Sequence, residues 1–345
     1  MSSIRKLFTL LIVFATLCTV AHAAPEGYTK AGSTENVFLF GDQGYQIEYR
    51  YDIEHKFRDQ IKEYIGNYNQ YLTGDDLDVY LYFVNNSRSI DFATDMSHAN
   101  DMYESILERL TCVDHAACLN IDSFETYMKY FYQTDHHWKY TGAQQGYEDI
   151  LKLLLGPDET PYVPVETVEF NILYNRSYSK RSGISNSTEK FTVYRYDMPS
   201  LKVTVNRKKQ LVDRQEQYFA GKHSKDIVAP HYNTFYGGDW GELVYETDRE
   251  DRENLLVLCN SFSSPLRRLL PQHFHKTCFV DLRYYSSQAK KSMKVRQYVQ
   301  ENKIDKILIL ADVSSFLMGK KCTDKPGRSN SLCGSFRHGL FCVCW

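Results

Sequence analysis

Two short stretches of the sequence hold side chains that suit acyl-group chemistry, and Ser261 lies in one of them. It follows the apolar run Leu255–Leu258 almost directly, so its hydroxyl is expected where a buried strand ends. Serine attacks a carbonyl carbon only with help from an adjacent base, usually a histidine oriented by a carboxylate. A serine after a strand is more often just the N-cap of the next helix, so Ser261 alone does not indicate an active site.

The second stretch is Asp135-His136-His137-Trp138. Residues two apart in an extended or turn segment point the same way, so Asp135 could orient the imidazole of His137. The other ring nitrogen would then be free for a serine. Two adjacent histidines beside an aspartate could instead bind a metal, and a surface loop with a packed Trp138 is the third interpretation. No role beyond structure is assigned to His136.

The elements around these stretches predict the α/β fold class. Strands are expected at 77–84, 127–132, 255–258, 277–280 and 304–310, and helices at 52–72, 100–110, 141–155, 265–273 and 287–302. The alternation in the last third predicts a parallel sheet flanked by helices. Ligands bind such sheets at the carboxyl ends of the strands, where the loops 260–262 and 311–315 stand. Short runs between Ser- and Asn-bearing turns predict antiparallel strands at 162–212, an insertion on the main sheet.

The N-terminus predicts export. Arg5 and Lys6 precede the apolar run Leu7–Val20, and Ala21-His22-Ala23 offers the small residues that signal peptidase reads. Residues 1–23 are therefore expected to be a signal peptide, and the mature protein to be secreted, periplasmic or associated with the cell envelope. A membrane is a partner only if this signal stays uncleaved.

Composition narrows the remaining functions. Charged residues make up 24% of the chain and its net charge is -2, which gives no electrostatic case for nucleic acid. No cofactor is expected. Export permits disulfides among the 9 cysteines, and Cys112 with Cys118 is the best local pair. Cys259 and Cys278 lie in apolar runs, where buried free thiols are the alternative. The tail at 318–345 holds Cys322, Cys333, Cys342 and Cys344.

Several motifs together resemble the DHHW family and the related alginate O-acetyltransferases. The matching stretches are Tyr132–Trp138 with Thr141-Gly142-Ala143, Phe235–Asp239, Leu255–Phe262, His273-Phe274 and Val280–Tyr285. The resemblance covers residues 35 to 315. It implies an SGNH-hydrolase-like domain at 24–317, with the β-rich insertion at 162–212 and a tail of unknown structure at 318–345.

By the same resemblance, Ser261 is the nucleophile of a catalytic triad, His137 its base and Asp135 the group that orients the base. The backbone N–H of Ser261 and a donor at Gly237 or Gly238 would form an oxyanion hole. The resemblance also places Asn260, Arg283, Tyr284 and Tyr285 at the site, as oxyanion or substrate contacts. Two positions depart from the family pattern: Asn260 replaces an acidic residue, and Asp312 stands where an asparagine is expected.

The sequence thus predicts an exported O-acetyltransferase or acetylesterase that acts on an envelope or extracellular polysaccharide. Its partners would be the carbohydrate substrate and, for a transferase, an acyl donor protein. The alternative from another class is a non-catalytic carbohydrate-binding or envelope-assembly protein that retains the fold. A metal-dependent hydrolase, built on the two histidines, is the third hypothesis.

Overall fold

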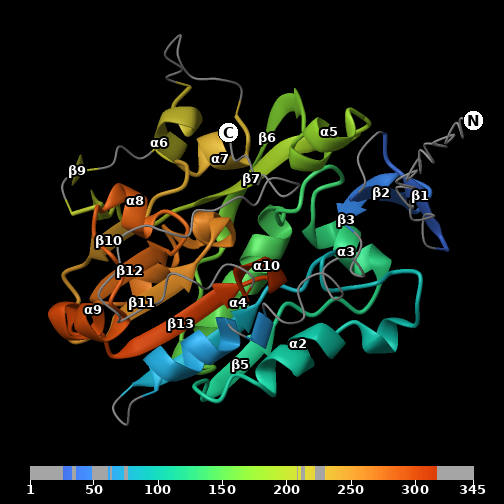
Figure 1. The fold of residues 1–345 in the computed structure, drawn as a ribbon. Helices are drawn as coiled ribbons and strands as arrows, with labels where there is room; N and C mark the ends of the chain where they lie inside the picture. Colours follow the sequence, from blue (N-terminus) through green and yellow to red (C-terminus); the bar gives the residue numbers. More distant parts are fainter. Residues whose placement is uncertain are drawn as a thin grey trace, which may run out of the picture.

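A large mixed sheet forms the centre of the molecule (Figure 1). The computed structural model describes residues 26–32, 36–48, 61–62, 64–73, 77–207, 209–210, 214–221 and 230–316. The sheet has eight strands in the order β5-β4-β13-β11-β12-β10-β8-β9. Pairs from β5 through β12 are parallel and the rest are antiparallel. The predicted α/β class is confirmed.

The elements have the following bounds. The strands of the main sheet are β4 (Asp78–Phe83), β5 (His115–Cys118), β8 (Lys202–Val205), β9 (Lys209–Gln210), β10 (Glu242–Glu246), β11 (Asn254–Cys259), β12 (Lys276–Asp281) and β13 (Lys306–Ala311). Two smaller sheets hold β1 (Tyr28–Lys30), β2 (Val37–Phe40) and β3 (Tyr45–Glu48), and β6 (Pro164–Leu173) with β7 (Lys190–Tyr196). The helices are α2 (Asp101–Leu107), α3 (Phe124–Tyr130), α4 (Tyr140–Leu155), α5 (Ser177–Ser182), α6 (Arg214–Phe219), α7 (Tyr232–Phe235), α8 (Tyr285–Gln288), α9 (Val295–Asn302) and α10 (Val313–Phe316). The 3-10 turns are η1 (Met96–His98), η2 (Ser261–Leu266) and η3 (Leu270–His273).

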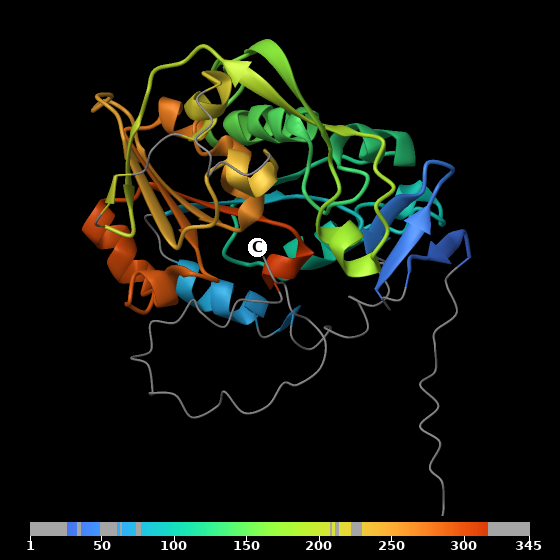
Figure 2. The same ribbon diagram turned by 90° about the horizontal axis from the view of Figure 1, so that it is seen from above.

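Alternating side chains of the central strands build one core on each face of the sheet. Tyr82 and Leu308 join the core that α4 covers, whereas Leu81 and Ile307 join the core that contains the helix at 64–72 and α9. Figure 2 shows α4 on one side of the sheet and the blue helix with α9 on the other. Within the described residues, no helix combines the length and the apolar character needed to cross a membrane.

Most elements predicted from the sequence are present. The strands β4, β11, β12 and β13 and the helices α2 and α4 confirm their predictions, as does helical structure at 61–62 and 64–72. The predicted helix at 265–273 is instead the pair of 3-10 turns η2 and η3, and that at 287–302 is divided between α8 and α9. The strands β5 and β10 and the sheet of β1, β2 and β3 were not predicted.

The strand predicted at 127–132 is wrong, because residues 124–130 form helix α3. Ser123 caps this helix by accepting a hydrogen bond from the Thr126 N–H at 3.0 Å. Aromatic rings then recur at helical spacing, and Tyr127 stacks on Phe131 one turn later with centroids 4.7 Å apart. Aromatic residues suit strands and buried helices alike, so composition misled the prediction here.

The segment at 162–212 divides between two sheets. Among the strands that the structure describes, β6 and β7 pair only with each other; α5 lies between them in the sequence, and β8 and β9 extend the main sheet. α5 packs beside β2 and β3, so the β6–β7 hairpin is joined to the N-terminal sheet (Figure 1).

The candidate disulfide between Cys112 and Cys118 is not formed, because both residues are free thiols, as are Cys259 and Cys278. The extended strand β5 carries the chain away from Cys112 before it reaches Cys118. The predictions of a signal peptide at 1–23, of the helix start at 52–60 and of a cysteine-bearing tail at 318–345 lie outside the described residues.

Trp138 is fully buried against α4 because that helix has a glycine where the indole lies. A Cβ at Gly146 would stand 2.6 Å from Cζ3 of Trp138, too close for any side chain. Trp138 has no exposed surface, so the indole is surrounded by other residues of the core. Gly146 is therefore required by its close contact with Trp138 and not by its backbone conformation.

We expect Gly146→Ala to lower the free energy of unfolding by about 1–3 kcal/mol, as overpacking does in well-packed cores. Gly66→Ala is the matched control, because Gly66 is exposed in the helix at 64–72 with nothing within 4 Å of an added Cβ. It should raise stability by about 0.5–1 kcal/mol. Urea unfolding measures both changes, and equal effects of the two substitutions would contradict this account.

Candidate active site

Three parallel strands end together and bring the polar loops to one edge of the sheet. Cys259, the last residue of β11, pairs with Asp281 of β12 and Leu310 of β13. Ser261 begins the turn η2 directly beyond this edge. Asn260 caps the turn, since its side-chain oxygen accepts a hydrogen bond from the Phe262 N–H at 3.0 Å. The two polar loops expected at the carboxyl ends of the strands, 260–262 and 311–315, therefore follow β11 and β13.

The Asp135–Trp138 stretch lies between α3 and α4, and a β-bridge between Phe131 and Trp138 closes it into a tight loop. The loop presents His137 to Ser261, with 2.8 Å between His137 Nε2 and Ser261 Oγ. On its other side, His137 Nδ1 lies 3.2 Å from Asp135 Oδ1. The structure thus brings the three residues into a continuous hydrogen-bonded chain.

The bonding pattern fixes which nitrogen of neutral His137 carries the proton. An ionised Asp135 can only accept, so Nδ1 donates to it and Nε2 is left to accept from the Ser261 hydroxyl. All three side chains are buried, with Asp135 3%, His137 8% and Ser261 4% exposed. Electrostatic contacts are stronger at such depth than in water. The arrangement can therefore pass the hydroxyl proton to imidazole.

Asp135 has further donors that hold it in its charged form. The Tyr174 hydroxyl donates to Oδ2 at 2.8 Å, and the Ser177 hydroxyl donates to Oδ1. Burial alone would favour the neutral acid, but the contacts with His137 and His136 outweigh it and hold the pKa of Asp135 well below its usual range. The carboxylate is thus ionised and fixed in place.

His136 stands beside this chain of contacts. Its ring lies 4.0 Å from that of His137, and its Nδ1 is 3.1 Å from Asp135 Oδ1 and 3.0 Å from Ser177 Oγ. Burial, the neighbouring His137 and the charge of Arg88 lower the pKa of His136 to about 4. His136 is therefore neutral at pH 7 and helps to surround the carboxylate.

Tyr232 of α7 fixes the other side of His137. Its ring stacks on the imidazole with centroids 4.0 Å apart. Its hydroxyl donates to the Ser261 carbonyl at 2.9 Å and accepts from the Trp138 indole N–H at 3.2 Å. One side chain therefore ties the histidine loop to the backbone of Ser261.

The candidates for the oxyanion hole have different surroundings. Gly238 donates its N–H to the Asn233 carbonyl at 2.8 Å, and the Asn260 amide donates to Asp312 and Ser315, so neither group is free to bind an oxyanion. The backbone N–H groups of Ser261 and Gly237 remain the candidates. Gly237 and Gly238 have φ values of 87° and 84°, which suit glycine alone.

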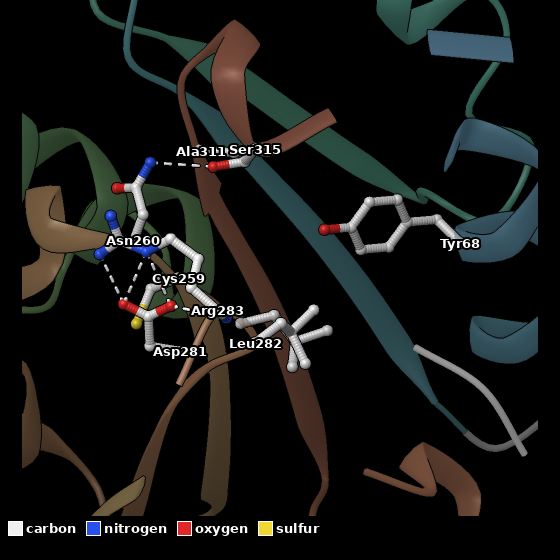
Figure 3. Close-up of a pocket in the computed structure, with 9 residues that line it drawn as sticks. Tyr68, Cys259, Asn260, Asp281, Leu282, Arg283, Ala311 and Ser315 are labelled. Atoms are coloured by element: carbon white, nitrogen blue, oxygen red, sulfur yellow. Dashed lines mark hydrogen bonds and ion pairs between the residues drawn. The ribbon is translucent and has the colours of Figure 1, made fainter. Parts of the chain in front are cut away.

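Arg283 lies at the same sheet edge, where it lines a small pocket with Asn260, Cys259 and Ser315 (Figure 3). Its guanidinium binds the Asp281 carboxylate in a bidentate contact, at 2.9 and 2.6 Å, which fixes it as part of the wall. The guanidinium also lies 5.0 Å from the centre of the Tyr284 ring. Tyr285 belongs to the core on the opposite face from His137, and the structure does not bring it to Ser261.

One ligand atom from each of Asp135, His136 and His137 lies within 4.8 Å of the others, which also suits a metal ion. The contacts of His137 bear on this hypothesis, because its Nδ1 faces Asp135 and its Nε2 faces Ser261. A metal bound by either nitrogen would displace one of these hydrogen bonds. The observed geometry matches the serine hypothesis more directly.

Tyr174, Ser177 and Tyr232 were not predicted from the sequence. Tyr174 and Ser177 come from the β6–β7 hairpin, 39 and 42 residues from Asp135. Tyr232 was overlooked although it stands three residues before the glycine loop motif at 235–239. Its closeness to that motif was the one signal in the sequence that could have pointed to it.

The fold is shared with two solved bacterial proteins. A structure of Bacillus cereus PatB1 with a sulfonyl adduct matches with a TM-score of 0.60 and 19% identity, over 83% of this chain and 99% of that protein. A DHHW family protein from Eubacterium siraeum matches with a TM-score of 0.59 and 18% identity, over 84% and 95%. No family model and no curated protein matches the sequence. The structural matches agree with the resemblance to the DHHW family and with the α/β fold predicted from the sequence.

The low pKa of Asp135 predicts how Asp135→Asn responds to pH. An unfolded aspartate has a pKa of about 3.9, so the ionised carboxylate stabilises the fold above that pH and this contribution is lost as the pH falls toward the lower folded pKa. We expect wild type to be more stable than Asp135→Asn, with the difference in unfolding free energy at its maximum above about pH 5 and decreasing below about pH 4.

Urea unfolding between pH 7 and 3 measures this gap. Asp158→Asn is the control, since Asp158 is exposed, and it should stay within about 0.5 kcal/mol of wild type throughout. A gap for Asp135→Asn that does not change with pH would contradict the assignment of a buried charge.

Proposed function

We propose that this chain, which has the fold of PatB1 and of a DHHW family protein, is an exported serine-dependent enzyme that transfers or hydrolyses O-acetyl groups of an envelope or extracellular polysaccharide. The observation that carries the proposal is the 2.8 Å contact between Ser261 Oγ and His137 Nε2, with Asp135 on the other side of the ring. Nucleophile, base and orienting carboxylate are in contact without any rearrangement.

The reaction would begin at Ser261. Its Oγ attacks the carbonyl carbon of an acetyl ester while His137 Nε2 takes the hydroxyl proton. The ionised Asp135 stabilises the imidazolium, and the backbone N–H groups of Ser261 and Gly237 would receive the charge on the carbonyl oxygen. When the tetrahedral intermediate collapses, His137 returns the proton to the departing alcohol. Ser261 is left acetylated.

The second half of the reaction repeats these roles with a new nucleophile. A sugar hydroxyl or water gives its proton to His137 and attacks the acetyl carbonyl, and His137 then protonates Ser261. Transfer and hydrolysis differ only in this acceptor. The motifs shared with alginate O-acetyltransferases favour a sugar hydroxyl, supplied with acetyl groups by a donor protein.

The sulfonyl adduct present in the PatB1 structure supports the choice of probe. Sulfonyl fluorides react with serines that an adjacent base activates, because the serine oxygen displaces fluoride from sulfur as the base removes the proton. Phenylmethylsulfonyl fluoride is therefore a direct reporter of the reactivity proposed for Ser261.

We expect the mature protein to hydrolyse 4-nitrophenyl acetate, and Ser261→Ala and His137→Ala each to reduce kcat at least about a hundredfold, because either change removes proton transfer to the base. Ser264→Ala is the matched control: Ser264 lies in the same turn, and its buried hydroxyl has no hydrogen-bond partner among the described residues. It should hydrolyse the ester at the wild-type rate. EDTA, which removes metal ions, should leave the rates of wild type and of this control unchanged.

Three results would redirect the proposal. Full activity of Ser261→Ala would exclude Ser261 as the nucleophile. Loss of activity in EDTA that zinc restores would favour the metal-dependent hydrolase. A wild-type protein that is inert toward the ester, yet binds polysaccharide as well as Ser261→Ala and His137→Ala do, would favour the carbohydrate-binding alternative.

A further inference from the structure

The two positions that depart from the family pattern contact each other. The Asn260 side-chain amide donates to Asp312 Oδ1 at 3.0 Å, although the two residues are 52 apart in the sequence. The same amide donates to Ser315 Oγ at 2.9 Å, a contact visible in Figure 3. Asn260 is 4% exposed and Asp312 is fully buried. Each substitution thus faces the other across the ends of β11 and β13.

The carboxylate of Asp312 is held by a buried cation. Arg88 Nη1 donates to Oδ2 at 3.1 Å, and the Asn86 amide donates to the same oxygen at 3.3 Å. Arg88 also pairs with Glu48 at the end of β3. Burial disfavours the charge on Asp312, but Arg88 outweighs it and lowers the pKa of that carboxyl. The negative charge of Asp312 is therefore matched by a buried cation and by amide donors.

Asn260 transmits this anchoring to Ser261. Its amide nitrogen is fixed by Asp312 and its amide oxygen accepts the N–H of Phe262, so the bonds of Asn260 hold the residues on both sides of Ser261. A shift of Asn260 would turn the Ser261 Oγ away from His137. Displacements of about 1 Å are enough to slow a reaction a hundredfold.

We propose that Asn260 and Asp312 are positioning residues that act as one reciprocal amide–carboxylate pair, which aims Ser261 at His137. The pair needs one amide and one carboxylate in contact. Two carboxylates would repel each other, and two amides would leave Arg88 and Arg181 to share the single carboxylate of Glu48. Exchanging the two groups keeps one of each. The proposal rests on the proposed function, since Ser261 reactivity is its readout.

The test compares wild type, Asn260→Asp, Asp312→Asn and the exchanged double variant. The rate constant for labelling by phenylmethylsulfonyl fluoride is measured on folded protein, with folding verified by circular dichroism. We expect each single change to slow labelling about tenfold or more, and the double variant to return to within about threefold of wild type, because coupled neighbours show large interaction energies. A purely structural role would lower the melting temperature without changing the rate for folded protein.

Asn171→Asp is the matched control, the same chemical change at an exposed position of β6, and it should label at the wild-type rate. A double variant that is as slow as the product of the two single effects would overturn the pair. Fast labelling of either single variant would overturn it too.

If the proposed function itself is wrong, phenylmethylsulfonyl fluoride will not label even the wild-type protein, and this result differs from every outcome above. The unfolding midpoints of the same four proteins then decide on the contact. A midpoint restored in the double variant supports the reciprocal pair, whereas additive losses overturn it.

Discussion

The buried carboxylate of Asp135 is the constraint on which the rest of the site depends. A charge with 3% of its surface exposed must be matched by donors, and within the described residues these come from two separate segments. The loop itself gives His136 and His137, while Tyr174 and Ser177 come from the β6–β7 hairpin. The hairpin is therefore part of the site, although its two strands lie outside the main sheet.

Asp312 is a second buried carboxylate near Ser261, and it is also matched by donors from other segments. Its charge is matched by Arg88, which also binds Glu48, so the N-terminal sheet is joined to the end of β13. Ser261 thus lies between two buried carboxylates: Asp135 contacts His137, and Asp312 contacts Asn260, the cap of the turn that begins at Ser261. The parallel strands supply the common edge on which both contacts are built.

The sequence was informative where chemistry lies in contiguous residues. Asp135, His137 and Ser261 were singled out because their two short stretches together resemble motifs of one family, and the structure brings the three side chains into contact. The parallel core followed from α/β alternation. Tyr174 and Tyr232 carried no comparable pattern, since their roles arise from contacts 39 and 94 residues away. Helix α3 was mistaken for a strand because aromatic residues suit both. The Asn260–Asp312 contact was visible only as two separate departures until the strand register placed them together.

The most direct measurement of the central claim is the location of the acetyl group on the enzyme. Protein mixed with an acetyl ester, quenched in acid within one turnover and digested, can be mapped by mass spectrometry. The account predicts acetylation of Ser261 in wild type and its loss in His137→Ala. An acetyl group on another residue, or turnover without any acetylated intermediate, would contradict it.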